Sequence, residues 1–255
     1  MTYFEGFVAA VPEANKDAYR EHANKVAPLL EQCGIRRMVE GWADDVPHGK
    51  VTDFHRAVEA HPGETIVFSF FEYSSKKERD SANQKFASDP RLQELGKDVP
   101  FDARRMIFGG FDSLVEAGSE PGTYINGFIV PIRRDQKDAY RQLTGSQAAI
   151  FREYGALRLV QACGDDVPHG TITDFYRAVQ AEPEETVVFA FIEWPSKQAS
   201  LEAWEKIMKD ERMQPSSEAP FDGKRMFWGG FDVILDTAKT TAVLEPVQVQ
   251  AAENR

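Results

Sequence analysis

The pattern of apolar and polar residues along the chain predicts strands in some segments and helices in others. A run of aromatic and β-branched residues from Tyr3 to Val11 predicts a strand. Apolar positions spaced by three and four from about Asn15 to Cys33 predict a helix that Gly34 ends. Two further strands are expected at about 35–42 and 65–73. The second of these is almost entirely apolar, which is typical of a strand buried on both faces.

The residues that follow complete one structural unit. Ser75 and Glu78 form a capping box, which predicts the start of a second helix. A fourth strand is expected at about 105–111, with a bulge at Gly109 and Gly110. The order β-α-β-β-α-β is that of a ferredoxin-like unit, in which both helices cover one face of a four-stranded antiparallel sheet.

The same pattern returns 121 residues later and then, after the loss of one residue, 120 residues later. The repeated segments are KDAYR at 16–20 and 137–141, DDVPHG at 44–49 and 165–170, and FDARRMIFGGFD at 101–112 matched by FDGKRMFWGGFD at 221–232. Because glycines, charges and aromatic residues match in the same order, the chain is a tandem duplication.

The repeat also sets the domain boundaries. We expect a first unit at 1–117, a linker at 118–122, a second unit at 123–237 and a flexible tail at 238–255. Each unit leaves one apolar sheet face uncovered, and its exposure to water costs about 25 cal/mol per Å². The sequence therefore predicts an α+β fold in which two ferredoxin-like βαββαβ units pack sheet to sheet as an intramolecular, pseudo-dimeric α/β barrel.

Composition narrows the classes of partner. The formal net charge of -11 argues against nucleic acid and against an anionic membrane surface. No stretch approaches the roughly 20 apolar residues of a membrane span, and the N-terminus lacks the pattern of a secretion signal. Cys33 and Cys163 are not equivalent positions, which excludes a repeated disulfide or a cysteine zinc site. We expect a cytoplasmic protein, either a monomeric pseudo-dimer or a dimer of pseudo-dimers.

Three motifs resemble a known family. They are DDVPHG followed by TDF and RAV, the ETVVF-type third strand, and the ending PFD-x-RM-x-x-GGFD. Over nearly all of both units these motifs resemble the YbaA-like domain of unknown function. The resemblance implies the dimeric α/β-barrel superfamily, whose members include cofactor-independent monooxygenases, haem-linked enzymes, isomerases, cyclases and binding proteins. So varied a superfamily assigns no activity, and the resemblance carries no agreed catalytic residues.

The DDVPHG segment offers the first candidate chemistry. His48 and His169 are candidate general bases, because an imidazole titrates near neutrality and nearby carboxylates orient it. The same residues would also suit a weak divalent metal site. Tight-turn chemistry is the alternative, since Asp, Pro and Gly shape turns and Asp caps backbone amides. No metal site is assigned.

Glu72 and Glu193 are candidate catalytic acids or bases on the third strand of each unit. Period two places each on the same face as two phenylalanines, and a carboxylate facing an aromatic lumen would have a raised pKa. A solvated position at the rim of the barrel explains them equally well.

Six arginines and two tyrosines are candidate substrate-binding residues. Arg56 and Arg177 would clamp a carboxylate or enolate, or form an ion pair with an aspartate of the adjoining loop, Asp44 or Asp45 in the first copy. The sheet arginines would neutralise a buried acid or an anionic ligand, and the tyrosines would donate a phenolic proton or pack in the core. These residues are Arg37, Arg158, Arg105, Arg225, Tyr3 and Tyr124.

The two copies also differ at positions where a ligand would feel the change. The pairs are Glu5 and Asn126, Glu40 and Gln161, Trp42 and Cys163, and His55 and Tyr176. If these side chains face the lumen, one half would be active and the other structural. Drift of surface residues after duplication is the alternative.

Function is less constrained than fold. No nucleotide-binding glycine loop, nucleophile elbow, zinc spacing or haem-attachment pair occurs, so no cofactor is indicated. The leading hypothesis is a barrel that binds a small, partly aromatic organic molecule and acts on it without a cofactor, as an oxygenase, isomerase or cyclase. Its rivals are a non-catalytic metabolite-binding protein and a stress-related structural protein.

Overall fold

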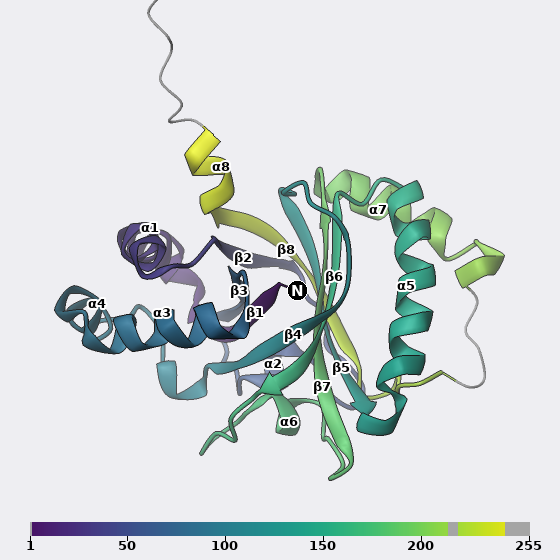
Figure 1. Cartoon of the computed structure of the whole chain (residues 1–255), viewed down its shortest axis with the longest axis horizontal. Helices are drawn as coiled ribbons and strands as arrows, with labels where there is room; N and C mark the ends of the chain where they lie inside the picture. The colour runs from purple at the N-terminus through teal and green to yellow at the C-terminus, as the bar shows by residue number, and fades with distance from the viewer. Residues whose placement is uncertain (1, 214–218, 243–255) are drawn as a thin grey trace, which may run out of the picture.

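The computed structural model describes residues 2–213 and 219–242. In this part of the chain eight strands form one closed antiparallel barrel, in the order β1-β3-β2-β8-β5-β7-β6-β4 (Figure 1). We call residues 2–118 the first half and residues 123–242 the second half. The strands of the first half are β1 (Tyr3–Pro12), β2 (Arg37–Asp45), β3 (Glu64–Tyr73) and β4 (Ile107–Gly118); those of the second are β5 (Tyr124–Arg133), β6 (Arg158–Asp166), β7 (Glu185–Trp194) and β8 (Phe227–Asp236).

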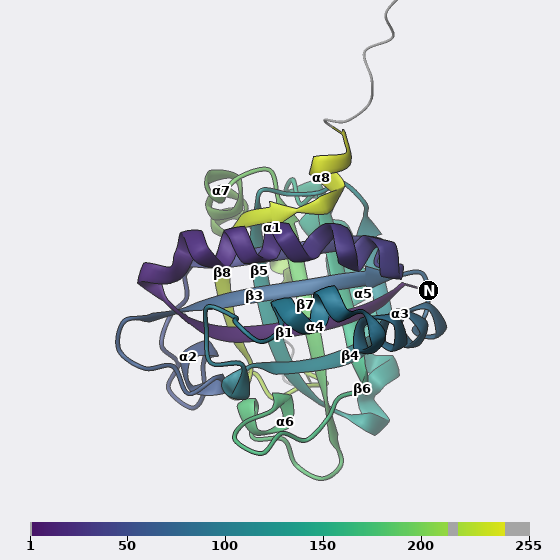
Figure 2. The same ribbon diagram turned by 90° about the vertical axis from the view of Figure 1, so that its left-hand side faces the viewer.

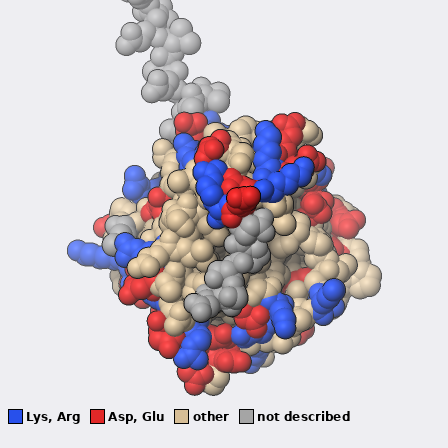
Figure 3. All heavy atoms as spheres, turned by 90° about the vertical axis from the view of Figure 1, so that its right-hand side faces the viewer, with Lys and Arg blue, Asp and Glu red and all other residues tan. Residues whose placement is uncertain are grey.

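Helices cover the outside of the barrel on two opposite sides. Figure 2 shows α1 (Lys16–Cys33), α3 (Lys76–Ser88) and α4 (Pro90–Leu95) across the strands of the first half. On the other side, α5 (Lys137–Glu153) and α7 (Lys197–Ile207) cover the second half (Figure 1). That second face carries acidic and basic side chains interspersed with uncharged ones (Figure 3). No helix of the described ranges is long and apolar enough to cross a membrane.

Three short helices complete the fold. The helices α2 (Phe54–Ala57) and α6 (Phe175–Ala178) contact each other at one end of the barrel, and α8 (Thr237–Ala242) follows β8. Asp53 begins α2, because its Oδ1 accepts a hydrogen bond from the backbone N of Arg56 at 2.8 Å. Part of the expected tail thus forms α8, and the rest of it, residues 243–255, lies outside the described residues.

The barrel closes through hydrogen-bonded strand edges that join the two halves. Strand β2 pairs with β8, and β4 pairs with β6. The predicted pseudo-dimeric barrel is confirmed, and the sheets are fused at their edges as well as packed face to face. The register of β4 against β6 shifts between Gly110 and Phe111, at the expected bulge. Strand β4 starts at Ile107, so Arg105 lies in a preceding 3-10 turn (Ala103–Arg105) and not in the strand as predicted.

Phenylalanine side chains fill the interior of the barrel. Phe68 stacks on Phe189 with ring centroids 4.5 Å apart, and Phe70 stacks on Phe191 at 4.1 Å. All four rings are fully buried, and they belong to one hydrophobic cluster that spans both halves. The lumen, where a ligand was expected from the sequence, is therefore filled by packed side chains.

Two glycines permit this packing. A Cβ atom on Gly6 would lie 2.6 Å from Cδ2 of Phe189, and one on Gly127 would lie 2.8 Å from Cε2 of Phe68. Gly6 is in β1 and Gly127 is the equivalent residue of β5, so each half supplies the glycine against which a ring of the other half lies. A side chain at either position would push the stacked rings apart.

Candidate functional site

The loop histidines lie on the surface. The side chains of His48 and His169 are 76% and 77% exposed. Each Nδ1 lies 3.7 or 3.6 Å from the aspartate that begins the next short helix, Asp53 or Asp174. Asp53 also accepts a hydrogen bond from the backbone N of Gly49 at 3.0 Å. This is the geometry of a capped turn, the alternative that the sequence left open.

Arg56 and Arg177 support the same turns. Nη1 of Arg56 donates to the carbonyl of Gly49 at 2.7 Å and lies 3.2 Å from Oδ2 of Asp53. The ion pair expected with Asp44 or Asp45 is therefore formed with Asp53. Arg177 likewise pairs with Asp174, Nε to Oδ2, at 3.5 Å.

Tyr3 and Tyr124 bind the loops of the opposite half. The hydroxyl of Tyr3 donates to Asp165 and that of Tyr124 donates to Asp44, both at 3.0 Å. Burial raises the pKa of both hydroxyls, and the neighbouring aspartates raise it further. These tyrosines therefore keep their protons and hold the two halves together.

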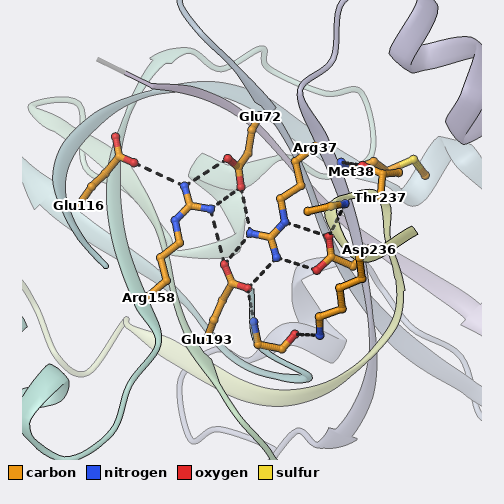
Figure 4. A network of polar contacts seen from close by, with 11 residues as sticks. Arg37, Met38, Glu72, Glu116, Arg158, Glu193, Asp236 and Thr237 are labelled. Atoms are coloured by element: carbon orange, nitrogen blue, oxygen red, sulfur yellow. Dashed lines mark hydrogen bonds and ion pairs between the residues drawn. The ribbon is translucent and has the colours of Figure 1, made fainter. Parts of the chain in front are cut away.

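A buried ionic network closes one end of the lumen (Figure 4). It consists of three equivalent pairs of residues, one from each half: Arg37 and Arg158, Glu72 and Glu193, and Glu116 and Asp236. Nη2 of Arg37 lies 2.7 Å from Glu193 and 2.8 Å from Asp236, while Nη2 of Arg158 donates to Glu72 at 3.2 Å.

The network answers the question that the sequence left open about its two glutamates. Glu72 and Glu193 are 9% and 0% exposed, so neither is a solvated rim residue. Each is held by an arginine of the opposite half. Each of the four carboxylates pairs with at least one of the two arginines, which suits a structural closure of the barrel.

Arg105 and Arg225 form two further structural pairs. Arg105 donates from Nη1 and Nη2 to the two carboxylate oxygens of Glu64, at 2.7 and 2.6 Å. Arg225 contacts Glu185 in the same way at 2.6 and 2.7 Å. The hydrogen bonds from Arg105 lower the pKa of Glu64 to about 2, so this carboxylate stays charged at neutral pH.

A cavity of about 190 Å³ lies under α1, against the outer face of the first-half strands. Strand alternation turns Glu40 of β2 and Ser69 of β3 to this face, and α1 contributes Tyr19 and His22. Aromatic and thioether side chains supply most of the remaining wall, including Phe7, Met38, Phe71, Phe101 and Met106.

Glu40 is the chemically distinctive residue of this cavity. It is 4% exposed, and its Oε2 accepts hydrogen bonds from the hydroxyls of Tyr19, at 2.7 Å, and of Ser69. Its Oε1 accepts no hydrogen bond from any residue that the structure describes, although Glu40 lines the cavity. One carboxylate oxygen is thus oriented by Tyr19 and Ser69, and the other accepts no hydrogen bond from the described residues.

Burial sets the protonation of the cavity residues. It raises the pKa of Glu40 from 4.5 to about 7, against the opposing effect of the hydrogen bonds from Ser69 and Tyr19. Burial and the Glu40 charge raise the pKa of Tyr19 well above its usual value, while burial lowers the pKa of His22. Near neutral pH, Glu40 exchanges its proton while Tyr19 remains a hydrogen-bond donor.

The second half has an equivalent cavity with different chemistry. It measures about 160 Å³ and lies under α5. Gln161 replaces Glu40 and Ala190 replaces Ser69, while Tyr140, the equivalent of Tyr19, donates to Oε1 of Gln161 at 2.7 Å. The difference at Glu40 and Gln161 therefore distinguishes two cavities under helices, and not two faces of a lumen.

The sequence-based candidates omitted Tyr19 and Ser69 and named Glu40 only as a difference between the copies. A usable signal was present. Glu40 alternates with Met38 and Trp42 in a strand, which places a carboxylate among apolar side chains on the helix-facing side. Among the residues with described positions, no group of three or more His, Cys, Asp or Glu is arranged to hold a metal ion.

Solved structures share this architecture at low sequence identity. A protein of Fusobacterium nucleatum described as a putative monooxygenase superposes with a TM-score of 0.58 and 7% identity, over 92% of this chain and 93% of that one. A putative monooxygenase of Lactobacillus acidophilus gives a TM-score of 0.57 and 11% identity, over 92% and 95%. These similarities show a common fold.

Sequence comparison is more specific. The uncharacterized protein YbaA of Escherichia coli K12 is 58% identical over 116 residues, which are 46% of this chain and 99% of YbaA. The model of a family described as a protein of unknown function, DUF1428, matches residues 2–103 and again residues 123–223. The chain therefore belongs to the DUF1428 family and carries two copies of its domain.

Proposed function

We propose that this protein binds a small, partly aromatic molecule in the cavity under α1 and that Glu40 acts on it as a general base without a cofactor. The observation that carries the proposal is a buried carboxylate with a pKa of about 7 in the wall of a cavity. A general base is most effective when its pKa lies close to the working pH.

The size and lining of the cavity limit the ligand. An apolar cavity of about 150 Å³ accepts benzene, so a cavity of about 190 Å³ suits one ring with small substituents. The rings of Phe7 and Phe71 are 4.7 Å apart and offer aromatic surface to such a ring. The ligand expected is a phenol, an enol or an enolisable aryl ketone.

The arrangement supports one proton transfer. Ionised Glu40 takes a proton from an O–H or an acidic C–H of the ligand onto Oε1, and the electron pair of the broken bond stays on the ligand. The hydrogen bonds from Tyr19 and Ser69 to Oε2 hold the carboxylate in place during this step. Return of the proton to another atom of the ligand completes an isomerisation.

Molecular oxygen is the first co-reactant to test with the ligand anion. Two proteins of the same fold are described as putative monooxygenases. Oxygen consumption in the presence of a bound phenol would place this chain with them, whereas proton exchange without oxygen consumption would favour an isomerase.

The experiment begins with a thermal-shift screen of phenols and enolisable aryl ketones, because binding to the native state raises the melting temperature. For each ketone that binds, the rate of deuterium incorporation from D₂O is measured by NMR. We expect Glu40→Gln to retain binding and to slow this exchange by about 10²- to 10⁴-fold. Equal exchange rates in the wild type and in Glu40→Gln would refute Glu40 as the base.

The loop histidines supply the matched control. His48 and His169 are exposed and lie on loops, outside the wall of the cavity. We expect the double variant His48→Gln, His169→Gln to exchange deuterium at the wild-type rate. Loss of exchange in this variant, with exchange retained in Glu40→Gln, would indicate that the general base is a histidine of the DDVPHG loops.

A further inference from the structure

The cavity of the second half has Gln161 where the first half has Glu40. It measures about 160 Å³ and is lined by apolar residues of β5, β7 and α5, among them Phe128, Phe151 and Ile192. Three of its polar wall residues are Tyr140, Thr144 and Gln161. Both halves therefore have a partly open, largely apolar cavity, and the two cavities differ in their central polar residue.

Gln161 presents an unpaired donor to this cavity. The residue is 9% exposed and lines the cavity. Oε1 accepts the hydrogen bond from Tyr140 at 2.7 Å, whereas Nε2 donates to no residue in the part of the chain that the structure describes. Nε2 lies in the wall of a largely apolar cavity, where a ligand acceptor could form a hydrogen bond with it.

The two cavities offer opposite hydrogen-bonding groups to a ligand. Ionised Glu40 offers an acceptor, Oε1, to the first cavity, while Gln161 offers a donor, Nε2, to the second. An amide does not ionise near neutral pH, so the second cavity holds no general base at this position. None of the described side chains that line it is charged, so it suits a neutral ligand of single-ring size with a hydrogen-bond acceptor.

We infer that the cavity under α5 is a non-catalytic binding site for a neutral, carbonyl-bearing aromatic molecule, such as an aryl ketone or a quinone. The inference goes beyond the proposed reaction and does not depend on Glu40. One chain would then hold a reacting molecule under α1 and a neutral carbonyl compound under α5.

Trp204 gives a direct readout of occupancy, because it lines the second cavity and the chain has four tryptophans. The full chain is labelled with 5-fluorotryptophan and titrated with acetophenone or ethylbenzene at pH 8.5. Glu40 is ionised at this pH and disfavours a carbonyl acceptor in the first cavity. The Trp204 fluorine resonance is identified with the variant Trp204→Phe.

We expect acetophenone to shift the Trp204 resonance saturably and to bind roughly fivefold more tightly than ethylbenzene, the gain typical of one net hydrogen bond. Glu40→Gln should leave this titration unchanged, which separates the inference from the proposed reaction. Ala190→Leu, which fills the cavity from β7, should abolish the shift.

The double variant Gln161→Met, Tyr140→Phe removes both hydrogen-bonding partners together, so that neither is left unsatisfied. We expect it to bind the two compounds equally. Equal affinity of the wild type for both compounds, a ketone preference that survives in the double variant, or the lack of a saturable Trp204 shift would overturn the inference.

Discussion

Arg37 of the first half and Glu193 of the second half are joined by two hydrogen bonds, from Nη1 to Oε1 at 2.8 Å and from Nη2 to Oε2 at 2.7 Å. Arg158 of the second half holds Glu72 of the first half in return. Both pairs are buried at one end of the barrel. Each half therefore supplies the arginine that neutralises a carboxylate of the other, and the duplicated units are chemically interdependent.

Removal of Arg37 tests this interdependence. Arg37→Met should lower the free energy of unfolding by about 3–5 kcal/mol, because it removes the guanidinium that pairs with the buried carboxylates of Glu193 and Asp236. Urea denaturation measures the change. Arg104→Gln is the control, since the Arg104 side chain is 79% exposed and its pair with Asp102 should contribute little to stability. Equal losses in both variants would contradict a structural role for the network.

A methyl group at Gly6 tests the packing of the lumen. Gly6→Ala places its Cβ against the ring of Phe189 and should destabilise the fold by about 1–3 kcal/mol. Gly145 of α5 is the matched control, because a Cβ there meets no atom within 4 Å. Gly145→Ala should stabilise the protein by about 0.5–1 kcal/mol, as expected in a helix interior. Thermal or urea unfolding that is unaffected by Gly6→Ala would show that the lumen has space to spare.

The first half alone should form a dimer. In the full chain β2 pairs with β8 and β4 pairs with β6, so residues 1–121 expressed alone would expose two unpaired edges and an apolar sheet face. Two copies of the half-chain would pair these edges and cover the apolar faces by forming the same interface as the two halves of the full chain. Analytical ultracentrifugation should find a dimer of the half-chain, and a folded monomer would contradict the account.

Glu40 makes stability depend on pH. Its pKa is about 7 in the folded protein and near 4.5 when unfolded, so above pH 4.5 the unfolded chain releases a proton that the folded protein retains. The contribution of protonated Glu40 is full below pH 4.5 and is lost as the pH rises to about 7, a fall of about 3 kcal/mol. Urea unfolding should show this fall for the wild type.

The glutamine variant isolates that contribution. Glu40→Gln has no carboxyl to titrate, so its stability relative to the wild type should rise by about 3 kcal/mol between pH 4.5 and pH 7. Gln161→Glu introduces a carboxyl at the equivalent site and should add a fall of the same sign. Parallel pH profiles for the wild type and Glu40→Gln would exclude a raised Glu40 pKa.

Much of the fold followed from the sequence because its signals are local or periodic. The almost wholly apolar run 65–73 predicted a strand buried on both faces, and β3 packs against the lumen on one side and helices on the other. The capping residue Ser75 begins a helix as predicted. The filling of the lumen by phenylalanine rings was not predictable, because it depends on how rings from different halves stack across the barrel.

The candidate site was harder to predict for a related reason. The residues that the two copies share, such as Asp44 and Asp165, appeared functional but form bonds between the halves, to Tyr124 and Tyr3. The chemistry that we propose lies where the copies differ, at Glu40 and Gln161. Sequence alone could not place that pair in cavities, because the cavities are formed by side chains of helices and strands far apart in the chain.

The most direct test of the account is the ionisation of Glu40 itself. The side-chain carboxyl carbon is followed by ¹³C NMR from pH 4 to pH 9, and its resonance is assigned by its loss in Glu40→Gln. The account predicts a titration midpoint of about pH 7. A midpoint near 4.5, the ordinary value of a solvated glutamate, would contradict it.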